Sequence, residues 1–220
     1  MSVANPNPST RCQIPAKAGL GKRVHAWMLA HCAAHYERMV AERKRRLLSG
    51  LSGDILEIGP GAGPNLGYYA KDARWVGVEP NPYMVPYLRK AAEQAGLKIE
   101  IRSGRAEELP AEDQSVDTVV STLVLCSVGD AARVLREIVR VLKPGGRFFF
   151  VEHVAAPEGT RLRRVQRFVR PLWRRIADGC HPDRETGAAI EQAGFTEVRY
   201  DQFRLPLGPV GTQIAGFARK

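Results

Sequence analysis

A strand that runs directly into alternating glycines is the feature that most constrains how this chain folds. Residues 54–66 read DILEIGPGAGPNL, in which alternating apolar residues are followed by Gly59, Gly61 and Gly63. Apolar alternation with a period of two predicts a strand. Glycines permit unusual backbone angles and place no Cβ in the way of a ligand. The pattern therefore predicts a turn that approaches a ligand at the carboxyl end of a strand.

Strand-like and helix-like segments alternate along the rest of the chain. We expect strands near residues 54–58, 75–79, 98–102, 116–121, 147–152, 195–203 and 212–218. We expect helices near residues 64–71, 83–95, 130–142, 161–177 and 183–193. LKPGG at 142–146 is typical of a helix stop followed by a turn. The alternation predicts an α/β fold with a mostly parallel seven-stranded sheet and helices on both faces.

The first 48 residues precede this alternation. Residues 1–21 show no periodicity, and we expect a flexible N-terminal arm there. Residues 22–48 contain no glycine or proline, and large side chains recur at spacings of three and four. This spacing predicts a helical cap. The cap begins a single domain over residues 22–220, because a chain of 220 residues is of ordinary size for one domain.

The chain is strongly basic, with a formal net charge of +10. Residues 161–175 carry seven arginines and no acid. This excess of basic residues is typical either of helix faces exposed to solvent or of a surface that binds an anionic partner. We find no interleaved aromatic and basic platform, so we expect no nucleic-acid partner. No apolar run reaches the roughly 18 residues of a membrane span. We expect a cytoplasmic protein, with peripheral membrane contact through its basic helices as an alternative to full solvation, and we favour a monomer.

The four cysteines form no familiar framework. They are Cys12, Cys32, Cys126 and Cys180, without a CxxC pair or a zinc-binding spacing. A disulfide scaffold is not expected in a domain of this size, which indicates a reducing compartment. We predict no metal site from this spacing.

Two acidic residues narrow the choice of ligand. Glu79 ends the strand RWVGVE, 20 residues after Gly59, where a carboxylate can accept from both hydroxyls of a ribose. Glu57 stands two residues before that glycine, where it would repel a pyrophosphate but suit a cationic amino group. The glycine spacing also differs from the G-x-G-x-x-G of dinucleotide sites. These features favour S-adenosyl-L-methionine (SAM) as cofactor.

Further motifs resemble those of class I SAM-dependent methyltransferases, which have a Rossmann-like fold. The matching segments are EPNPYM (79–84), GRAEELP (104–110), SVDTVVSTLVLCSV (115–128) and RVLKPGGRFFFVEHV (140–154). The resemblance implies that the ribose and adenine lie beside the segment after the second strand and that the methionine end lies near the fourth strand. The cofactor residues expected are Glu57, Gly59, Gly61, Gly63, Glu79, Pro80, Asn81, Met84, Ala106, Glu107, Thr122 and Leu123.

A closer resemblance covers about residues 50–220. STLVLCSV, EHV, PLWRRIADGCH (171–181), AGF and the terminal GFARK look like the microsomal alkyl-thiol S-methyltransferases of the methyltransferase-like 7 group and like bacterial thiol S-methyltransferases. This implies an enzyme that transfers a methyl group from SAM to the thiol of a small, fairly apolar molecule. The alternative is C- or O-methylation of a lipid, quinone or phenol. The animal members begin with a hydrophobic anchor, whereas this chain begins with a basic, amphipathic segment.

Three residues are the candidates for catalysis. A thiol with a pKa near 8.5 needs only modest activation. His153 lies at the end of the strand expected near residues 147–152 and is the first candidate for a base or an orienting group. The alternative is a structural histidine bonded to a backbone carbonyl. Asp178 and His181 in the DGCH segment are the others, although Asp, Gly and Pro there are also ordinary turn residues.

Four residues are candidates for the acceptor pocket: Trp27, His31, Cys126 and Trp173. Cys126 also suits the role of a small buried hydrophobe, which we favour over a ligand for a soft substrate. The helix near 161–177 carries an apolar face, which either packs on the core beneath snorkelling arginines or contacts a lipid surface. Pro171 is expected to kink or split this helix.

Overall fold

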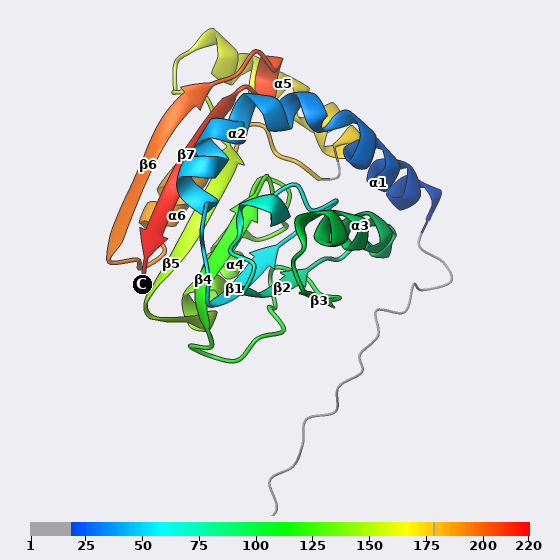
Figure 1. The fold of residues 1–220 in the computed structure, drawn as a ribbon. Helices are drawn as coiled ribbons and strands as arrows, with labels where there is room; N and C mark the ends of the chain where they lie inside the picture. Colours follow the sequence, from blue (N-terminus) through cyan, green and yellow to red (C-terminus); the bar gives the residue numbers. More distant parts are fainter. Residues whose placement is uncertain (1–18, 178) are drawn as a thin grey trace, which may run out of the picture.

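The computed structural model describes residues 19–177 and 179–220. Its seven strands form one sheet in the order β3-β2-β1-β4-β5-β7-β6 (Figure 1). They are β1 (Asp54–Ile58), β2 (Arg74–Val78), β3 (Ile99–Arg102), β4 (Val116–Thr122), β5 (Leu142–His153), β6 (Glu197–Arg204) and β7 (Thr212–Arg219). Strands β1 to β5 pair in parallel, and β7 runs antiparallel to β5 and β6. The predicted α/β fold with a mostly parallel seven-stranded sheet is confirmed.

The helices follow the predicted order with several local differences. They are α1 (Leu20–Cys32), α2 (Ala34–Leu48), α3 (Val85–Ala95), α4 (Ala131–Val141), α5 (Arg161–Ile176) and α6 (Thr186–Glu191), with 3-10 turns η1 (Leu66–Tyr68), η2 (Pro82–Met84) and η3 (Gly208–Val210). The expected cap helix is divided at Ala33. The helix expected over 64–71 is only η1, because Pro64 and Gly67 are poor helix formers.

Two proline-containing segments differ in part from expectation. Pro171 does not split α5, which runs from Arg161 to Ile176, and a kink at this residue stays a prediction. The expected helix stop is confirmed, because α4 ends at Val141. The turn expected at residues 142–146 lies within β5 as an irregularity: Leu142 pairs with Val116 and Arg147 pairs with Thr118, so the extra residues are on β5. A bulge of this kind accommodates a proline inside a ladder.

Side-chain caps begin two helices, and a left-handed glycine ends a third. The Asp130 side chain accepts a hydrogen bond from the Arg133 N–H at the start of α4. Thr160 does the same for Arg163 at the start of α5. Helix α3 ends at Gly96, whose φ of 62° is left-handed and suits glycine. These positions satisfy backbone groups that a helix leaves unpaired at its ends.

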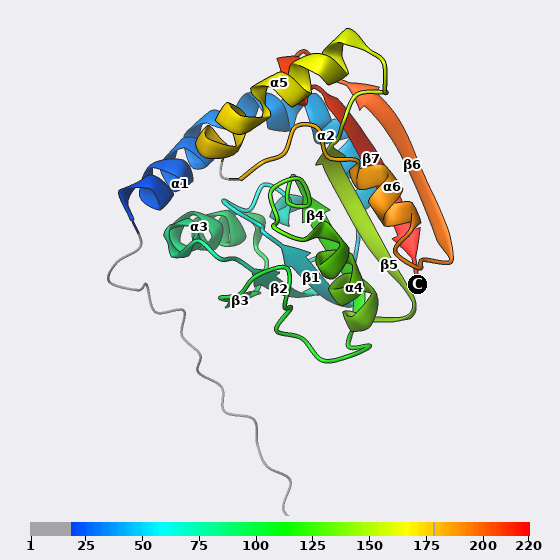
Figure 2. The same ribbon diagram turned by 180° about the vertical axis from the view of Figure 1, so that it is seen from behind.

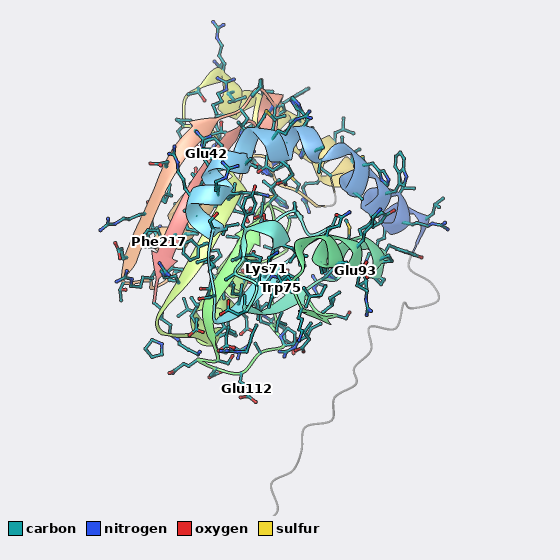
Figure 3. The ribbon with its side chains drawn as sticks, in the orientation of Figure 1. Glu42, Lys71, Trp75, Glu93, Glu112 and Phe217 are labelled. Carbon is teal, nitrogen blue, oxygen red and sulfur yellow. The ribbon has the colours of Figure 1, made fainter. Side chains whose placement is uncertain are left out.

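Helices cover both faces of the sheet. One core cluster contains Trp75 of β2, Leu48 of α2 and Leu88 of α3. The other joins α4 and α6 to the opposite face, through residues such as Ile138 and Ile190. Figure 2 shows this second face, and Figure 3 shows Trp75 inside the molecule and the exposed Glu112 at its rim. The sheet is therefore buried on both sides, as parallel sheets require.

Helices α1 and α5 run along the edge of the molecule above the carboxyl ends of the strands, and Figures 1 and 2 agree on this placement. In the described part of the chain, no helix combines the length and apolar character that a membrane span requires. The edge that carries α1 and α5 is thus the edge at which a ligand of an open α/β sheet binds.

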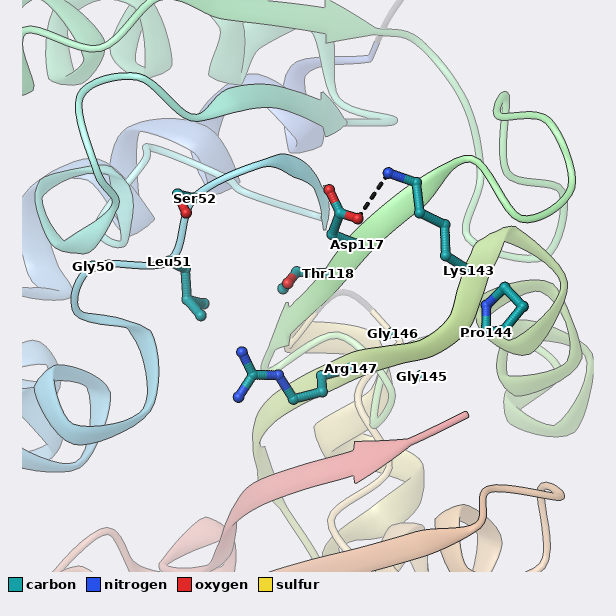
Figure 4. A pocket seen from close by; sticks show the side chains of 10 residues that line it. All are labelled: Gly50, Leu51, Ser52, Asp117, Thr118, Lys143, Pro144, Gly145, Gly146 and Arg147. Atoms are coloured by element: carbon teal, nitrogen blue, oxygen red, sulfur yellow. Dashed lines mark hydrogen bonds and ion pairs between the residues drawn. The ribbon is translucent and has the colours of Figure 1, made fainter.

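The opposite edge, at the amino ends of β4 and β5, holds a cavity of about 330 Å³ (Figure 4). Lys143 at its rim contacts Asp54 at 2.9 Å and Asp117 at 2.7 Å. Hydrogen bonds from Arg74 and then Lys143 hold the pKa of Asp54 well below its usual range. The cavity lies away from the glycine turn, so we assign the ion pairs around it to stability rather than to ligand binding.

Candidate active site

The glycine turn after β1 adopts the backbone that only glycine tolerates well. Gly59, Gly61 and Gly63 have φ values of 59°, 55° and 83°. A Cβ at Gly59 would lie 2.7 Å from Val124 Cγ2, so this glycine also permits close packing. A Cβ at Gly61 would meet nothing within 4 Å in the described part of the chain. Gly61 therefore faces open space at the strand end, where a ligand could lie against its backbone.

Glu79 joins the glycine turn to the segment after β2. Its two carboxylate oxygens accept hydrogen bonds from Gly61 N at 3.0 Å and from Asn81 N at 2.8 Å. Asn81 Nδ2 in turn donates to the Lys22 carbonyl at 3.1 Å, which holds α1 over this segment. Met84 is buried and Pro80 is exposed. The predicted ribose residues are thus brought together at the ends of two neighbouring strands.

Glu57 is engaged by protein donors. Its side chain is 1% exposed, and its carboxylate accepts from Asn65 Nδ2 at 2.8 Å, Tyr69 OH at 2.7 Å and Trp75 Nε1 at 3.0 Å. Burial raises its pKa, while hydrogen bonds from Tyr69, Asn65 and Trp75 act in the opposite direction. Glu57 therefore orients Asn65, a residue that the sequence motifs did not single out.

Asn65 provides a test of whether a SAM-like cofactor fits this turn. Its Nδ2 donates to both Glu57 and Thr122 Oγ1, the latter at 3.1 Å. Its Oδ1 is buried and has no hydrogen-bond partner among the described residues. A buried acceptor of this kind needs a donor, and an α-ammonium group would supply one. The open space at Gly61 and the carboxylate of Glu79 complete a set that fits SAM.

The remaining cofactor candidates line the ends of β3 and β4. Ala106 is 8% exposed, and Glu107 Oε1 accepts from Gly129 N at 2.9 Å, which ties the segment after β3 to the one that precedes α4. Leu123 has a φ of 56°, a strained value for a residue with a side chain. Its N–H donates to Val151 O at 2.9 Å. Strain of this kind at a strand end is typical of functional sites.

Three buried side chains meet at the ends of β4 and β5, and we call Cys126, His153 and Cys180 the thiol–imidazole cluster. Their ligand atoms all lie within 4.8 Å of one another. Cys180 Sγ lies 3.2 Å from His153 Nε2 and accepts from Trp173 Nε1 at 3.2 Å. The Cys126 hydrogen bond and then the His153 imidazole lower the pKa of Cys180 to about 5, and burial raises that of Cys126.

The other predicted residues are placed at different distances from this cluster. His181 N donates to Cys126 O at 2.8 Å, and burial followed by Arg184 lowers the pKa of the His181 imidazole. Trp27 stacks on His31 with ring centroids 5.0 Å apart, and His31 lies edge-on to Tyr87 of α3. These rings lie on the cofactor side. Asp178 lies outside the described residues.

Glu152 is a site residue that the sequence reasoning passed over in favour of the adjacent histidine. It is wholly buried, and its Oε1 accepts from Ser121 Oγ at 2.6 Å, Val124 N at 3.0 Å and Leu125 N at 3.1 Å. Its Oε2 has no partner in the described part of the chain. A glutamate inside the apolar run RFFFVEHV was the available signal, because burying a carboxylate is costly unless other groups hydrogen-bond to it. Glu152 shapes the backbone that carries Cys126.

Comparison with known proteins is consistent with this geometry. A family model described as a methyltransferase domain matches residues 56–150. The thiol S-methyltransferase TMT1B of Rattus norvegicus is 39% identical over 90% of this chain and 87% of its own length, and TMT1A of Homo sapiens is 38% identical with the same coverage. The YcgJ protein of Bacillus subtilis shares the fold, with a TM-score of 0.58 at 19% identity over 83% of this chain and 96% of its own. This chain therefore belongs to the methyltransferases, in the family of the thiol S-methyltransferases TMT1A and TMT1B.

Proposed function

We propose that this enzyme transfers the methyl group of SAM to the thiol of a small, fairly apolar molecule. The observation that carries the proposal is the position of a buried, sulfur-rich cluster at the ends of β4 and β5, on the same edge of the sheet as the cofactor turn. The relatives at 38–39% identity are thiol S-methyltransferases, which supports the same acceptor class.

The cofactor supplies an electrophilic methyl group on a sulfonium when it is bound. Glu79 would hold the ribose hydroxyls, and Asn65 would accept from the amino group through the oxygen that has no protein partner. The backbone of Gly61 would lie against the cofactor, since no side chain occupies that space. Rigid placement of the donor and the acceptor accounts for much of the rate in a displacement of this kind.

The acceptor needs a dry site and a way to lose its proton. His153 is 4% exposed and Cys126 is 1% exposed, so water has little access to the cluster. A thiolate and a sulfonium neutralise each other as they react, and a water-poor site favours that loss of charge. We propose that His153 orients the acceptor thiol or takes its proton; His181, which is bonded to the backbone beside Cys126, is the second candidate. Asp178 remains a candidate on sequence grounds.

An acceptor panel tests this proposal. Purified protein is incubated with labelled SAM and with alkyl thiols, a dithiol, hydrogen sulfide, a quinol, a catechol or phosphatidylethanolamine. We expect methyl sulfides from the thiols and no labelled product from the oxygen, carbon or amine acceptors. Labelled quinol, phenol or lipid with unreacted thiols would contradict S-methylation and favour the C- or O-methyltransferase alternative.

We further propose that the edge formed by α1 and α5 contacts the surface of an anionic membrane from the cytoplasmic side. Four apolar side chains of α5 form a row at spacings of three and four and are largely exposed: Val165, Phe168, Leu172 and Ile176. Phe168 is 86% exposed, which argues against the expected core-facing packing of this row. On α1, Leu20, Val24, Trp27 and Met28 are exposed as well. Neither helix contains an acidic residue, and α5 contains seven arginines. Exposed apolar rows flanked by arginine are typical of interfacial helices.

Co-sedimentation with vesicles tests the lipid contact. We expect binding to vesicles that contain phosphatidylserine, weaker binding to pure phosphatidylcholine, and loss of binding in a Phe168→Ser, Leu172→Ser double variant. Glu112→Ser, at an exposed site away from this edge, serves as the control. Equal sedimentation of the double variant and the wild type would exclude α5 as the contact.

A further inference from the structure

The thiol–imidazole cluster has the composition of a metal site with one position open. It presents two sulfur atoms and one imidazole nitrogen from three separate segments, and all three side chains are buried. Two cysteines and one histidine are a recognised ligand set for catalytic zinc, which keeps a fourth position for water or substrate. The spacing of these residues in the sequence does not reveal the set, because they lie far apart in the chain. Cys126 follows β4, His153 ends β5 and Cys180 follows α5.

The distances in the cluster suit a tetrahedral ion. Zinc bonds of about 2.3 Å to sulfur and about 2.0 Å to nitrogen place ligand atoms roughly 3.5 to 3.8 Å apart in a tetrahedron. The observed separations lie within 4.8 Å, and Cys180 Sγ is 3.2 Å from His153 Nε2. Closure onto an ion therefore requires side-chain movements of only a few tenths of an ångström to about one ångström, well within rotamer freedom.

The segments that carry the cluster are fixed by two backbone contacts and by one hydrogen bond to a ligand sulfur. His181 N donates to Cys126 O at 2.8 Å, which joins the segment after α5 to the segment after β4. Gly179 packs so closely on Ser127 O that a Cβ would lie 3.2 Å from it. Trp173 Nε1 donates to Cys180 Sγ, as outer partners of metal thiolates do. The ligand set is thus pre-organised by its surroundings.

We propose that Cys126, His153 and Cys180 bind one Zn²⁺ ion and that the acceptor thiol occupies the fourth position as a thiolate. This inference rests on the proposed S-methyltransferase function and adds the means of activating the acceptor. With the ion bound, His153 positions the acceptor sulfur through the ion, and solvent rather than His153 takes the proton. It replaces our expectation from cysteine spacing that the chain has no metal site. Soft thiolate and imidazole ligands select zinc over magnesium or calcium.

The reaction balances without a further reactant. The acceptor loses its S–H proton to solvent as its sulfur binds the ion, which makes a thiolate available at neutral pH. A sulfur lone pair then forms the new S–CH₃ bond while the sulfonium–CH₃ bond breaks and its electron pair stays on the cofactor sulfur. The products are a thioether and S-adenosylhomocysteine. A neutral thioether is a weaker zinc ligand than a thiolate, so the product leaves the ion.

Zinc content is the first test, and it is independent of methyl transfer. The wild-type protein is loaded with zinc sulfate under a non-thiol reductant, desalted and analysed by elemental mass spectrometry. We expect about one zinc per chain, falling at least about fivefold in Cys126→Ser, Cys180→Ser and His153→Gln. Cys12→Ser, in the N-terminal segment, is the matched control and should retain the ion. Wild-type protein that holds no zinc after loading would overturn the proposal.

Cobalt substitution is the second test, and it does not depend on a variant that folds. Co²⁺ in the wild-type protein should give the thiolate charge-transfer absorption of a cysteine-ligated tetrahedral site, and an added alkyl thiol should change that absorption. A spectrum that shows ligation but ignores the thiol would overturn the role of the fourth position. Zinc-free protein that methylates thiols at the full rate would overturn zinc activation and leave the S-methyltransferase function intact. Zinc-loaded protein that methylates no thiol would contradict the function and leave the metal site intact.

Discussion

The cofactor side of the site and its acceptor side are built in different ways. On the cofactor side, Gly61 and Glu79 follow two neighbouring parallel strands, and the Gly61 N–H donates a hydrogen bond to the Glu79 carboxylate. On the acceptor side, Cys126, His153 and Cys180 come from three segments that meet only in the folded chain. The first side is one continuous strand–turn–strand unit, which suits a cofactor shared by many enzymes. The second is an assembly whose parts can vary with the acceptor.

Blocking the glycine turn should give the largest effect and should affect the cofactor side alone. In Gly61→Val, a branched side chain must adopt a φ near 55° and enter the open space at the strand end. We expect SAM binding to weaken at least about 100-fold, because strain of about 1–2 kcal/mol is added to steric exclusion. Calorimetric titration measures this. Gly67→Val is the control, since that glycine has an ordinary φ and open surroundings. Wild-type affinity in Gly61→Val would separate the turn from the cofactor.

A change at His153 should impair the acceptor side and leave the cofactor side intact. In His153→Gln, the buried imidazole beside Cys180 is lost while the cofactor turn is untouched. We expect kcat/KM for the thiol to fall about 100-fold with an unchanged Kd for SAM. Steady-state kinetics and calorimetry on the same preparation measure both quantities. His35→Gln on the exposed side of α2 should leave both unchanged. Full turnover in His153→Gln would remove this residue from the acceptor site.

A milder change on the cofactor side tests whether SAM binding can be weakened without affecting the thiol. Glu79→Gln removes the charge that accepts from Gly61 N and Asn81 N and that would hold the ribose. Hydrogen bonds to charged groups contribute about 1.5–3 kcal/mol, so we expect the Kd for SAM to rise about 10-fold or more. The KM for the thiol should not change. Glu100→Gln on β3, whose carboxylate pairs with Arg102 at the surface, is the control. A raised thiol KM would show that the two sides are coupled.

The smallest effect is expected at the amino ends of the strands, and it should concern stability only. Arg74 and Lys143 lower the pKa of Asp54, so its ionised form favours the folded state. That contribution is present above the ordinary Asp pKa of about 4 and is lost as pH falls through the lowered value. Asp54→Asn should therefore reduce the free energy of unfolding by about 1 kcal/mol at pH 7, with a smaller difference below pH 4.

Denaturant unfolding at several pH values measures this difference, with Asp201→Asn at an exposed site as the control. Unchanged SAM affinity and turnover in Asp54→Asn would agree with a structural role for this end of the sheet. A loss of activity at equal stability would show that the cavity beside Lys143 contributes to function.

The contrast between the two sides also explains what the sequence could reveal. The succession of strands along the chain and the residues of the glycine turn follow from local patterns, because each strand and the turn after it form one continuous segment. The partners of Glu57 did not follow, since Asn65, Tyr69 and Trp75 reach it only through tertiary packing. The sequence left the exposure of Phe168 open, because an apolar row at helical spacing looks the same whether it faces the core or the solvent.

The acceptor side was only partly visible for the same reason. Cys126 and Trp173 were predicted for the acceptor pocket, and both lie close to Cys180, which was not itself among the predicted site residues. No spacing rule connects three segments that far apart in the chain. Trp27 and His31 were predicted for the acceptor pocket as part of a covering N-terminal helix, and their ring contacts are with each other and with α3.

The hydrogen bond from Asn81 Nδ2 to the Lys22 carbonyl has a consequence for the timing of the catalytic cycle. It fastens the first turn of α1 to the segment that would carry the ribose. A cofactor held by Glu79 would therefore lie next to this contact, and its departure would be easier when the contact opens. We expect the rate of that departure, rather than the methyl transfer itself, to respond when Asn81 is shortened to alanine, and pre-steady-state bursts of product would reveal which step sets the pace.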